Sequence, residues 1–213
     1  MDWKKRLTKE RSFFQVYWKA REVASSRWNS RIPLISVLIL AIGWWVSFDC
    51  GYPVVTNSQL VTGVRAVADI GFSLTVAILG FLVAGFAIFS SITKPEVFVI
   101  LAKLDHTKGA ISRLQFMFFN FLFVFINFGV FLAVCIAVNL CLLRNGPFFG
   151  AVQLILSLES IYVSHVVMAL FSALVGWVVF LLMLLKSFIW NLYQAVLVTI
   201  GVEAELLERG KEG

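Results

Sequence analysis

Residues 70–93 read IGFSLTVAILGFLVAGFAIFSSIT, a run without a charged side chain between Asp69 and Lys94. A segment that crosses a bilayer alone must satisfy its backbone hydrogen bonds internally, so it must be a helix. The run is long enough to span the hydrocarbon core, which takes about 20 apolar residues. The sequence therefore predicts a transmembrane helix here.

Three other uncharged stretches flank this one, at residues 32–48, 114–143 and 160–185. As helices the first would extend about 25 Å and the second about 45 Å, so the second must tilt or protrude. The whole chain has 213 residues, of which 60% are hydrophobic and 14% are charged. A soluble domain could not cover its surface with so few charges, so we expect an all-α integral membrane protein with four transmembrane helices.

The distribution of basic residues predicts the orientation. Sixteen Lys and Arg fall on one side of the expected membrane, and only Arg65 and Arg144 fall on the other. By the positive-inside rule both termini are cytoplasmic. The 31-residue polar lead before the first span indicates an anchor and not a cleaved signal peptide. We therefore divide the chain into a basic amphipathic arm (1–31), a four-span membrane domain (32–185) and a cytosolic helix with a tail (186–213).

The connections carry their own signals. Aromatic residues recur at helical spacing among the basic residues of 2–30, which is typical of a helix lying in the headgroup region; packing on a partner's cytosolic surface is the alternative. Thr93 as a cap, Pro95 in the first turn and Glu96 three residues after Thr93 are typical of a helix start, so 94–106 is expected to be a short amphipathic helix.

The stretch 145–158 either starts the fourth helix early, which we prefer, or re-enters the membrane. Arg65 and Asp69 are expected at the outer edge, where they could pair.

The second span carries small residues along one helical face. They are Ser73, Ala77, Gly80, Ala84, Ala87 and Ser91. Small side chains let two helices approach closely in lipid. We expect this face to pack against another span of the same chain; a subunit interface or a pore lining is the alternative.

Polar side chains occur in two other spans. Asn120 and Asn127 share a face of the third span, where buried amides usually bond to neighbouring helices; a polar path is the alternative. In the fourth span Glu159 and His165 lie near the outer end. His165 is expected to be neutral and hydrogen-bonded, with a proton-responsive site as the alternative.

The sixteen residues after Lys186 are uncharged, and no turn signal separates them from the fourth span. We expect one long helix that leaves the membrane. Leu185, Ile189, Leu192 and Val196 form a seam on this helix that a sister subunit, the inner connection or a partner protein must cover.

The sequence contains few residues that could carry out catalysis. The chain has two histidines, no nucleotide-binding glycine pattern and no metal-type cluster, so we expect no enzyme activity, no cofactor, no metal and no direct nucleic-acid binding. Cys50 and Cys141 are both expected near the outer face. A disulfide between them is less favoured than free, buried thiols.

The layout, with the stretch LGFLVAGFAIFSSITKPE at 79–96, resembles the membrane subunit of the Kiwa antiphage defence system. The resemblance covers the whole chain and implies a bacterial inner-membrane protein that acts with a cytosolic partner and reports phage attack. It assigns no functional residue. We therefore expect an oligomeric scaffold or sensor that recruits or regulates a cytosolic protein partner. The alternative is a homo-oligomeric ion channel whose pore is lined by the small residues or by the two asparagines.

Overall fold

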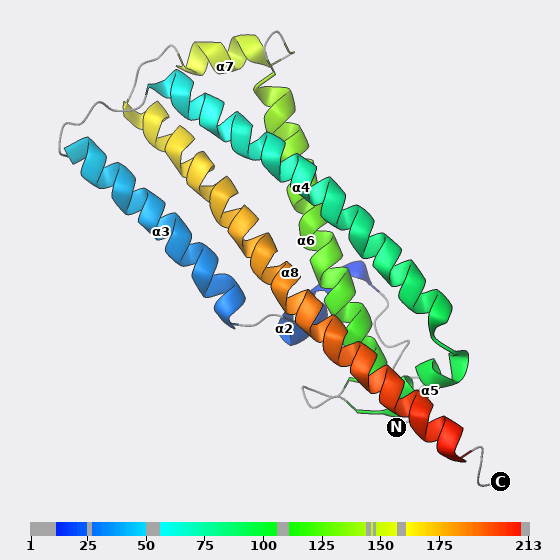
Figure 1. Ribbon diagram of the computed structural model, residues 1–213. Helices are drawn as coiled ribbons and strands as arrows, with labels where there is room; N and C mark the ends of the chain where they lie inside the picture. The colour runs from blue at the N-terminus through cyan, green and yellow to red at the C-terminus, as the bar shows by residue number, and fades with distance from the viewer. Residues whose placement is uncertain are drawn as a thin grey trace. The chain divides into compact units, whose positions relative to one another are not determined.

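The computed structural model describes residues 12–24, 27–49, 56–105, 111–143, 146, 148–156 and 161–209. These residues form helices joined by short connections (Figure 1). The helices are α2 (Phe13–Ala24), α3 (Arg27–Asp49), α4 (Asn57–Ile92), α5 (Pro95–Lys103), α6 (Arg113–Cys141), α7 (Phe149–Leu156) and α8 (Ile161–Arg209).

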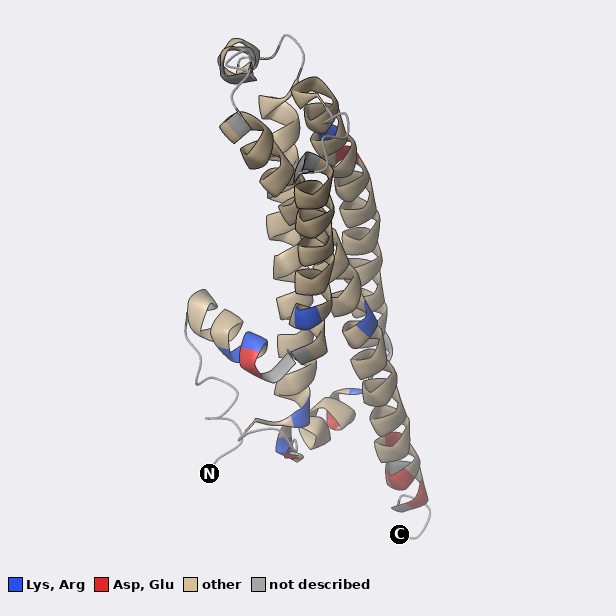
Figure 2. Cartoon of the chain, turned by 90° about the vertical axis from the view of Figure 1, so that its left-hand side faces the viewer, with Lys and Arg blue, Asp and Glu red and all other residues tan. Residues whose placement is uncertain are grey.

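Four helices are long and apolar enough to cross a membrane, at Trp28–Ser47, Asn57–Ser91, Arg113–Cys141 and Tyr162–Glu205. Most of the described helical ribbon carries no charged residue (Figure 2). The prediction of an all-helical chain with four apolar helices is therefore confirmed. The cytoplasmic placement of both termini stays a prediction.

The chain divides into two compact units. Unit 1 comprises Met1–Ser26, Gly80–Ile126 and Leu184–Gly213, and unit 2 comprises Arg27–Leu79 and Asn127–Met183. The helices α4, α6 and α8 each contribute residues to both units.

The start of α4 differs from the prediction, because the helix begins at Asn57 and not near residue 70. A capping box fixes this start. The Thr56 backbone N–H donates to Oε1 of Gln59 over 3.0 Å, and the Gln59 N–H donates to Oγ1 of Thr56 over 3.4 Å. Each residue thus satisfies a backbone donor of the first turn that the helix itself cannot pair.

A second capping box starts α6. The Ser112 N–H donates to Oε1 of Gln115 over 3.1 Å, and the Gln115 N–H donates to Oγ of Ser112 over 3.2 Å. Both side chains are buried, so these bonds replace water that the first turn has lost.

In unit 2, α3 and α8 run antiparallel. Gly176 of α8 lies against Val37 and the carbonyl of Pro33 on α3. Eleven residues from Gly176 along α8, the ring of His165 meets the ring of Trp44 edge-on, with centroids 6.3 Å apart. The two contacts follow one another in opposite order on the two helices, from Val37 to Trp44 on α3 and from Gly176 back to His165 on α8, so the helices run in opposite directions.

The part of α4 in unit 2 runs parallel to α8. Near its start, Oγ of Ser164 donates to Oδ1 of Asn57 over 2.6 Å. Two turns further on, Gly63 lies against the ring of Phe171. The hydrogen bond and the glycine contact hold α4 beside α8 from the first turn of each helix.

In unit 1, the connection between α4 and α6, where we predicted a short amphipathic helix over 94–106, contains the helix α5, which packs against the end of α8. Val97, Leu101 and Ala102 of α5 are buried, and they form a cluster with Leu114, Val198 and Val202 among others. The connection between α4 and α6 was one of the three predicted covers for the tail, and it covers the part of α8 around Val198 and Val202. The predicted Thr93 cap is wrong: the N-cap is Lys94, and Oγ1 of Thr93 donates to the carbonyl of Phe89 over 2.8 Å.

An ion pair joins the same two elements. Nζ of Lys94 lies 2.6 Å from Oε1 of Glu203 near the end of α8. The hydrogen bond and the charge of Glu203 raise the pKa of Lys94 above its ordinary value. The contribution of Lys94 to this pair is therefore present at neutral pH and is lost as pH rises through the raised pKa. Both side chains are largely exposed, so the pair orients α8 more than it stabilises the fold.

The predicted seam on α8 is displaced. The residues of this region that are buried are Leu184, Phe188 and Ala195, whereas Ile189 and Val196 are exposed and Leu185 and Leu192 are half-buried. The helix α8 is continuous from Ile161 to Arg209, so no break marks the predicted boundary at residue 185.

The connection before α8 is also not as expected. It holds a separate helix, α7, instead of an extension of α8 (Figure 1). Val152 of α7 lines a cavity together with Val61 of α4 and Tyr162 of α8. The first eleven residues of the basic arm, together with Cys50, His106, Arg144 and Glu159, lie outside the described residues. Cys141 is exposed and free.

Candidate functional site

The exposed side of α4 carries a stripe of small residues, with large apolar residues such as Ile70, Phe81 and Ile88 exposed beside it. Ser73, Ala77, Gly80, Ala84, Ala87 and Ser91 are all exposed. A Cβ added at Gly80 would meet nothing within 4 Å. The opposite side of α4 is the one that the chain buries, through Leu60, Val64, Ala68, Thr75 and Leu82. The expectation that the small residues pack against another span of the same chain is therefore wrong.

This face continues toward the start of α4 with charged residues. Arg65 and Asp69 are exposed, and Asp69 precedes Ser73 by one turn. Neither forms a hydrogen bond or an ion pair with any residue that the structure describes, so the predicted pair between them is absent. We call Arg65, Asp69 and the six small residues the α4 face.

A contact in unit 2 places these charges beside α6. Gly71, two residues after Asp69 on α4, lies against the ring of Phe131 and Sγ of Cys135 on α6. The predicted position of Arg65 and Asp69 at the outer edge stays a prediction.

A charge at the centre of a membrane helix is costly if lipid surrounds it, at about 2.5–3.5 kcal/mol for Arg or Asp. The α4 face combines these two charges with two serines, three alanines and a glycine. Large apolar side chains, among them Ile70, Phe81 and Ile88, are exposed beside it. The small residues leave room for another helix to approach closely.

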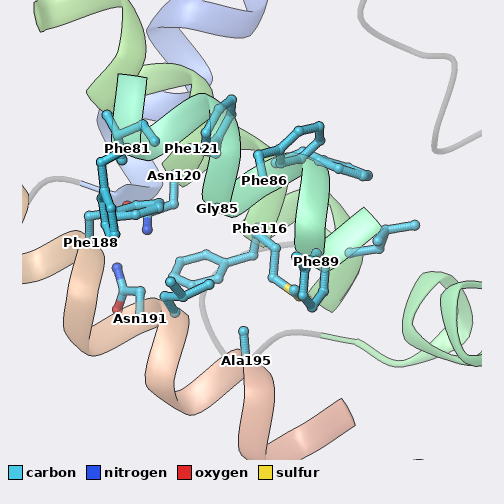
Figure 3. A pocket seen from close by; sticks show the side chains of 15 residues that line it. Phe81, Gly85, Phe86, Phe89, Phe116, Asn120, Phe121, Phe188, Asn191 and Ala195 are labelled. Carbon is cyan, nitrogen blue, oxygen red and sulfur yellow. The ribbon is translucent and has the colours of Figure 1, made fainter. Parts of the chain in front are cut away.

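Unit 1 contains an aromatic cavity of about 70 Å³ between α4, α6 and α8 (Figure 3). Phe86 stacks on Phe121 with ring centroids 4.5 Å apart, and Phe121 meets Phe188 at 6.2 Å. Gly85 lies on the wall of the cavity, and a Cβ there would meet nothing within 4 Å. The volume is about half that of an engineered apolar cavity that holds benzene.

Two amides face this cavity from different helices. Asn120 of α6 is 4% exposed, and Asn191 of α8 points toward it from the other side (Figure 3). The described residues offer neither side chain a hydrogen bond. Asn127, the other predicted amide, is also buried, but it interacts with other groups of the chain. The sequence thus located two buried amides and missed Asn191.

The two predicted asparagines should respond in opposite ways to the same substitution. Asn120→Leu removes a buried amide to which the described residues supply no hydrogen bond, so we expect the free energy of unfolding to rise by about 1 kcal/mol. Asn127→Leu removes an amide that interacts, and we expect a loss. Thermal unfolding in detergent, followed by tryptophan fluorescence, measures both. A loss of stability in both variants would show that Asn120 has a partner.

The fourth-span residues are placed as follows. His165 is exposed, packs edge-on against Trp44 and has further interactions, so it is not a solitary group. Tyr162 is 79% exposed. Among the described residues no three His, Cys, Asp or Glu side chains are grouped to hold a metal ion.

The far half of α8 presents an exposed apolar face. Its members include two of the predicted docking residues, Ile189 and Val196, and they are accompanied by Trp190, Tyr193, Leu197 and Ile200. This face lies beside, and not on, the buried contact through Phe188 and Ala195.

Comparison with known proteins found no matching family model, no matching curated protein and no matching solved structure.

Proposed function

We propose that this chain is an oligomeric scaffold or sensor of the bacterial inner membrane that recruits or regulates a cytosolic protein partner in phage defence. The observation that carries the proposal is the α4 face. An exposed stripe of small residues on a helix that is apolar enough to cross a membrane lets a second helix approach closely, and interfaces between membrane helices are enriched in such residues.

The partner surface is assigned to the far half of α8. Its exposed apolar residues recur at helical spacing, and Ile189, Tyr193 and Ile200 are each more than half exposed. The ion pair between Lys94 and Glu203 and the cluster with α5 hold this helix in place. A partner would therefore meet a fixed apolar surface, which lowers the ordering cost of binding.

The mass of the assembly tests the oligomer. We expect native mass spectrometry of the purified protein in mild detergent to give a multiple of the 23.9 kDa chain. The same mass should be found by light scattering at several detergent concentrations. A chain that stays monomeric across these conditions contradicts the proposal.

A homo-oligomeric channel is the second candidate, because the α4 face is polar as well as small. Copies arranged around a ring would place Arg65, Asp69 and Ser73 against water in place of protein. Planar-bilayer recordings separate the two functions. A steady current that is altered by Asp69→Asn supports the channel, whereas an oligomer without current supports the scaffold.

A further inference from the structure

We propose that the aromatic cavity of unit 1 binds the hydroxyl end of an uncharged aliphatic amphiphile, with Asn120 and Asn191 as its hydrogen-bonding partners. All of the described residues that line the cavity belong to unit 1. The site is therefore complete in a single copy of the chain, and it does not depend on the proposed oligomer.

The two amides are the observation that points to a ligand. Asn120 is 4% exposed and Asn191 is half-buried, and both side chains face the cavity (Figure 3). The described residues supply neither side chain with a hydrogen bond. A buried amide that has exchanged water for no other partner is costly. A ligand in the cavity restores the missing hydrogen bonds.

The chemistry of the walls selects an uncharged hydroxyl group. None of the described lining residues is charged, so a carboxylate or an ammonium group would find no counter-ion there. An amide both donates and accepts hydrogen bonds. A hydroxyl group also does both, so it can accept from the amide nitrogen of one asparagine and donate to the amide oxygen of the other. An ether or a ketone can only accept.

The size of the cavity limits how much of the ligand it takes in. An engineered apolar cavity of about 150 Å³ holds benzene, which has six non-hydrogen atoms. By the same ratio, a cavity of about 70 Å³ holds about three. These correspond to the hydroxyl oxygen and the first two carbons of an alcohol, and aromatic side chains such as Phe121 and Phe188 line the space around them.

The remaining carbons of the ligand can leave the cavity past apolar side chains. Phe81 of α4 is 63% exposed and Phe118 of α6 is 38% exposed, although both line the cavity. The cavity thus reaches the surface of unit 1 beside two aromatic rings. An alkyl chain that leaves here keeps its contact with apolar groups, on helices that are apolar enough to cross a membrane.

Photolabelling of the purified protein in detergent tests the site. The probe is an octanol with a diazirine on its third carbon, and mass spectrometry of the digested protein identifies the labelled residues. We expect label at the mouth of the cavity, around Phe81 and Phe118, and competition by unlabelled octanol. Ionised octanoate should compete about tenfold less well, because its charge finds no partner. A probe with the diazirine on its seventh carbon should label residues outside the cavity.

Two variants alter the site itself. Asn120→Leu removes a hydrogen-bonding partner and is expected to raise the probe concentration for half-maximal labelling about fivefold or more. Gly85→Leu places a side chain on the cavity wall, where a Cβ meets nothing within 4 Å, and is expected to raise it about tenfold or more. The matched controls Gln194→Leu and Gly201→Leu change residues of unit 1 that do not line the cavity, and they should label like the wild type.

Three results would overturn the proposal. Equal labelling of Gly85→Leu and the wild type would show that the probe binds elsewhere, and equal competition by octanoate and octanol would show that the site does not select an uncharged group. A wild-type protein without label at the mouth would show that the cavity holds water only. An unfolding temperature of Asn120→Leu at or above that of the wild type shows that its lost labelling does not come from misfolding.

Discussion

Gly80→Leu is expected to dissociate the oligomer, with a rise in the dissociation constant of about tenfold or more. The new side chain meets nothing within 4 Å at its Cβ inside its own chain, so the fold of the single copy should accept it. In a close helix contact, an inserted leucine costs about 1–3 kcal/mol in overpacking, and 1.4 kcal/mol corresponds to a factor of ten. Native mass spectrometry in mild detergent measures the change.

The matched control is Gly43→Leu on α3. Gly43 is also exposed, and a Cβ there also meets nothing within 4 Å, but it lies on a helix whose outward face is apolar and large. We expect this variant to keep the wild-type mass. Equal masses for Gly80→Leu, Gly43→Leu and the wild type would show that α4 does not form the interface between copies.

Gly176→Leu is expected to have the largest effect on the fold of a single copy. A Cβ at this position would collide with Cγ2 of Val37 on α3 and would lie 3.7 Å from the carbonyl oxygen of Pro33. Val37 is β-branched and has little rotameric freedom in a helix, so the backbones of α3 and α8 must separate. We expect a loss of about 3 kcal/mol in the free energy of unfolding, measured by thermal unfolding in detergent.

Gly201→Leu on the same helix provides the comparison. A Cβ at Gly201 meets nothing within 4 Å, so this variant should unfold at nearly the wild-type temperature. The difference between the two variants isolates the contact from any general effect of leucine on α8. A wild-type unfolding temperature for Gly176→Leu would show that α3 does not pack where the structure places it.

The four apolar helices could be predicted because charged residues separate four long uncharged stretches of the chain. The same rule misplaced the start of α4, since it read Asp69 as a membrane boundary. Thr56 and Gln59, three residues apart, carried the missing signal of a helix start, and the structure shows both of their hydrogen bonds. With α4 started at Asn57, Arg65 and Asp69 lie within the helix and not at its start.

Periodicity identified the small-residue face and the buried amides but not their surroundings. Spacing shows which residues share a side of a helix; it does not show which side the chain covers. On α4 the bulkier side is buried and the small residues are exposed. On α8 the predicted seam fell one position from the buried residues Leu184 and Phe188, because apolar residues occur on almost every side of that helix.

The ion pair at the end of α8 is open to the solution. The side chains of Lys94 and Glu203 are both exposed, so dissolved ions screen their attraction, and the screening length falls to about 3 Å at 1 M salt. Concentrated salt should therefore loosen this charged tether while the apolar cluster of Val97, Leu101 and Val202 keeps its hold.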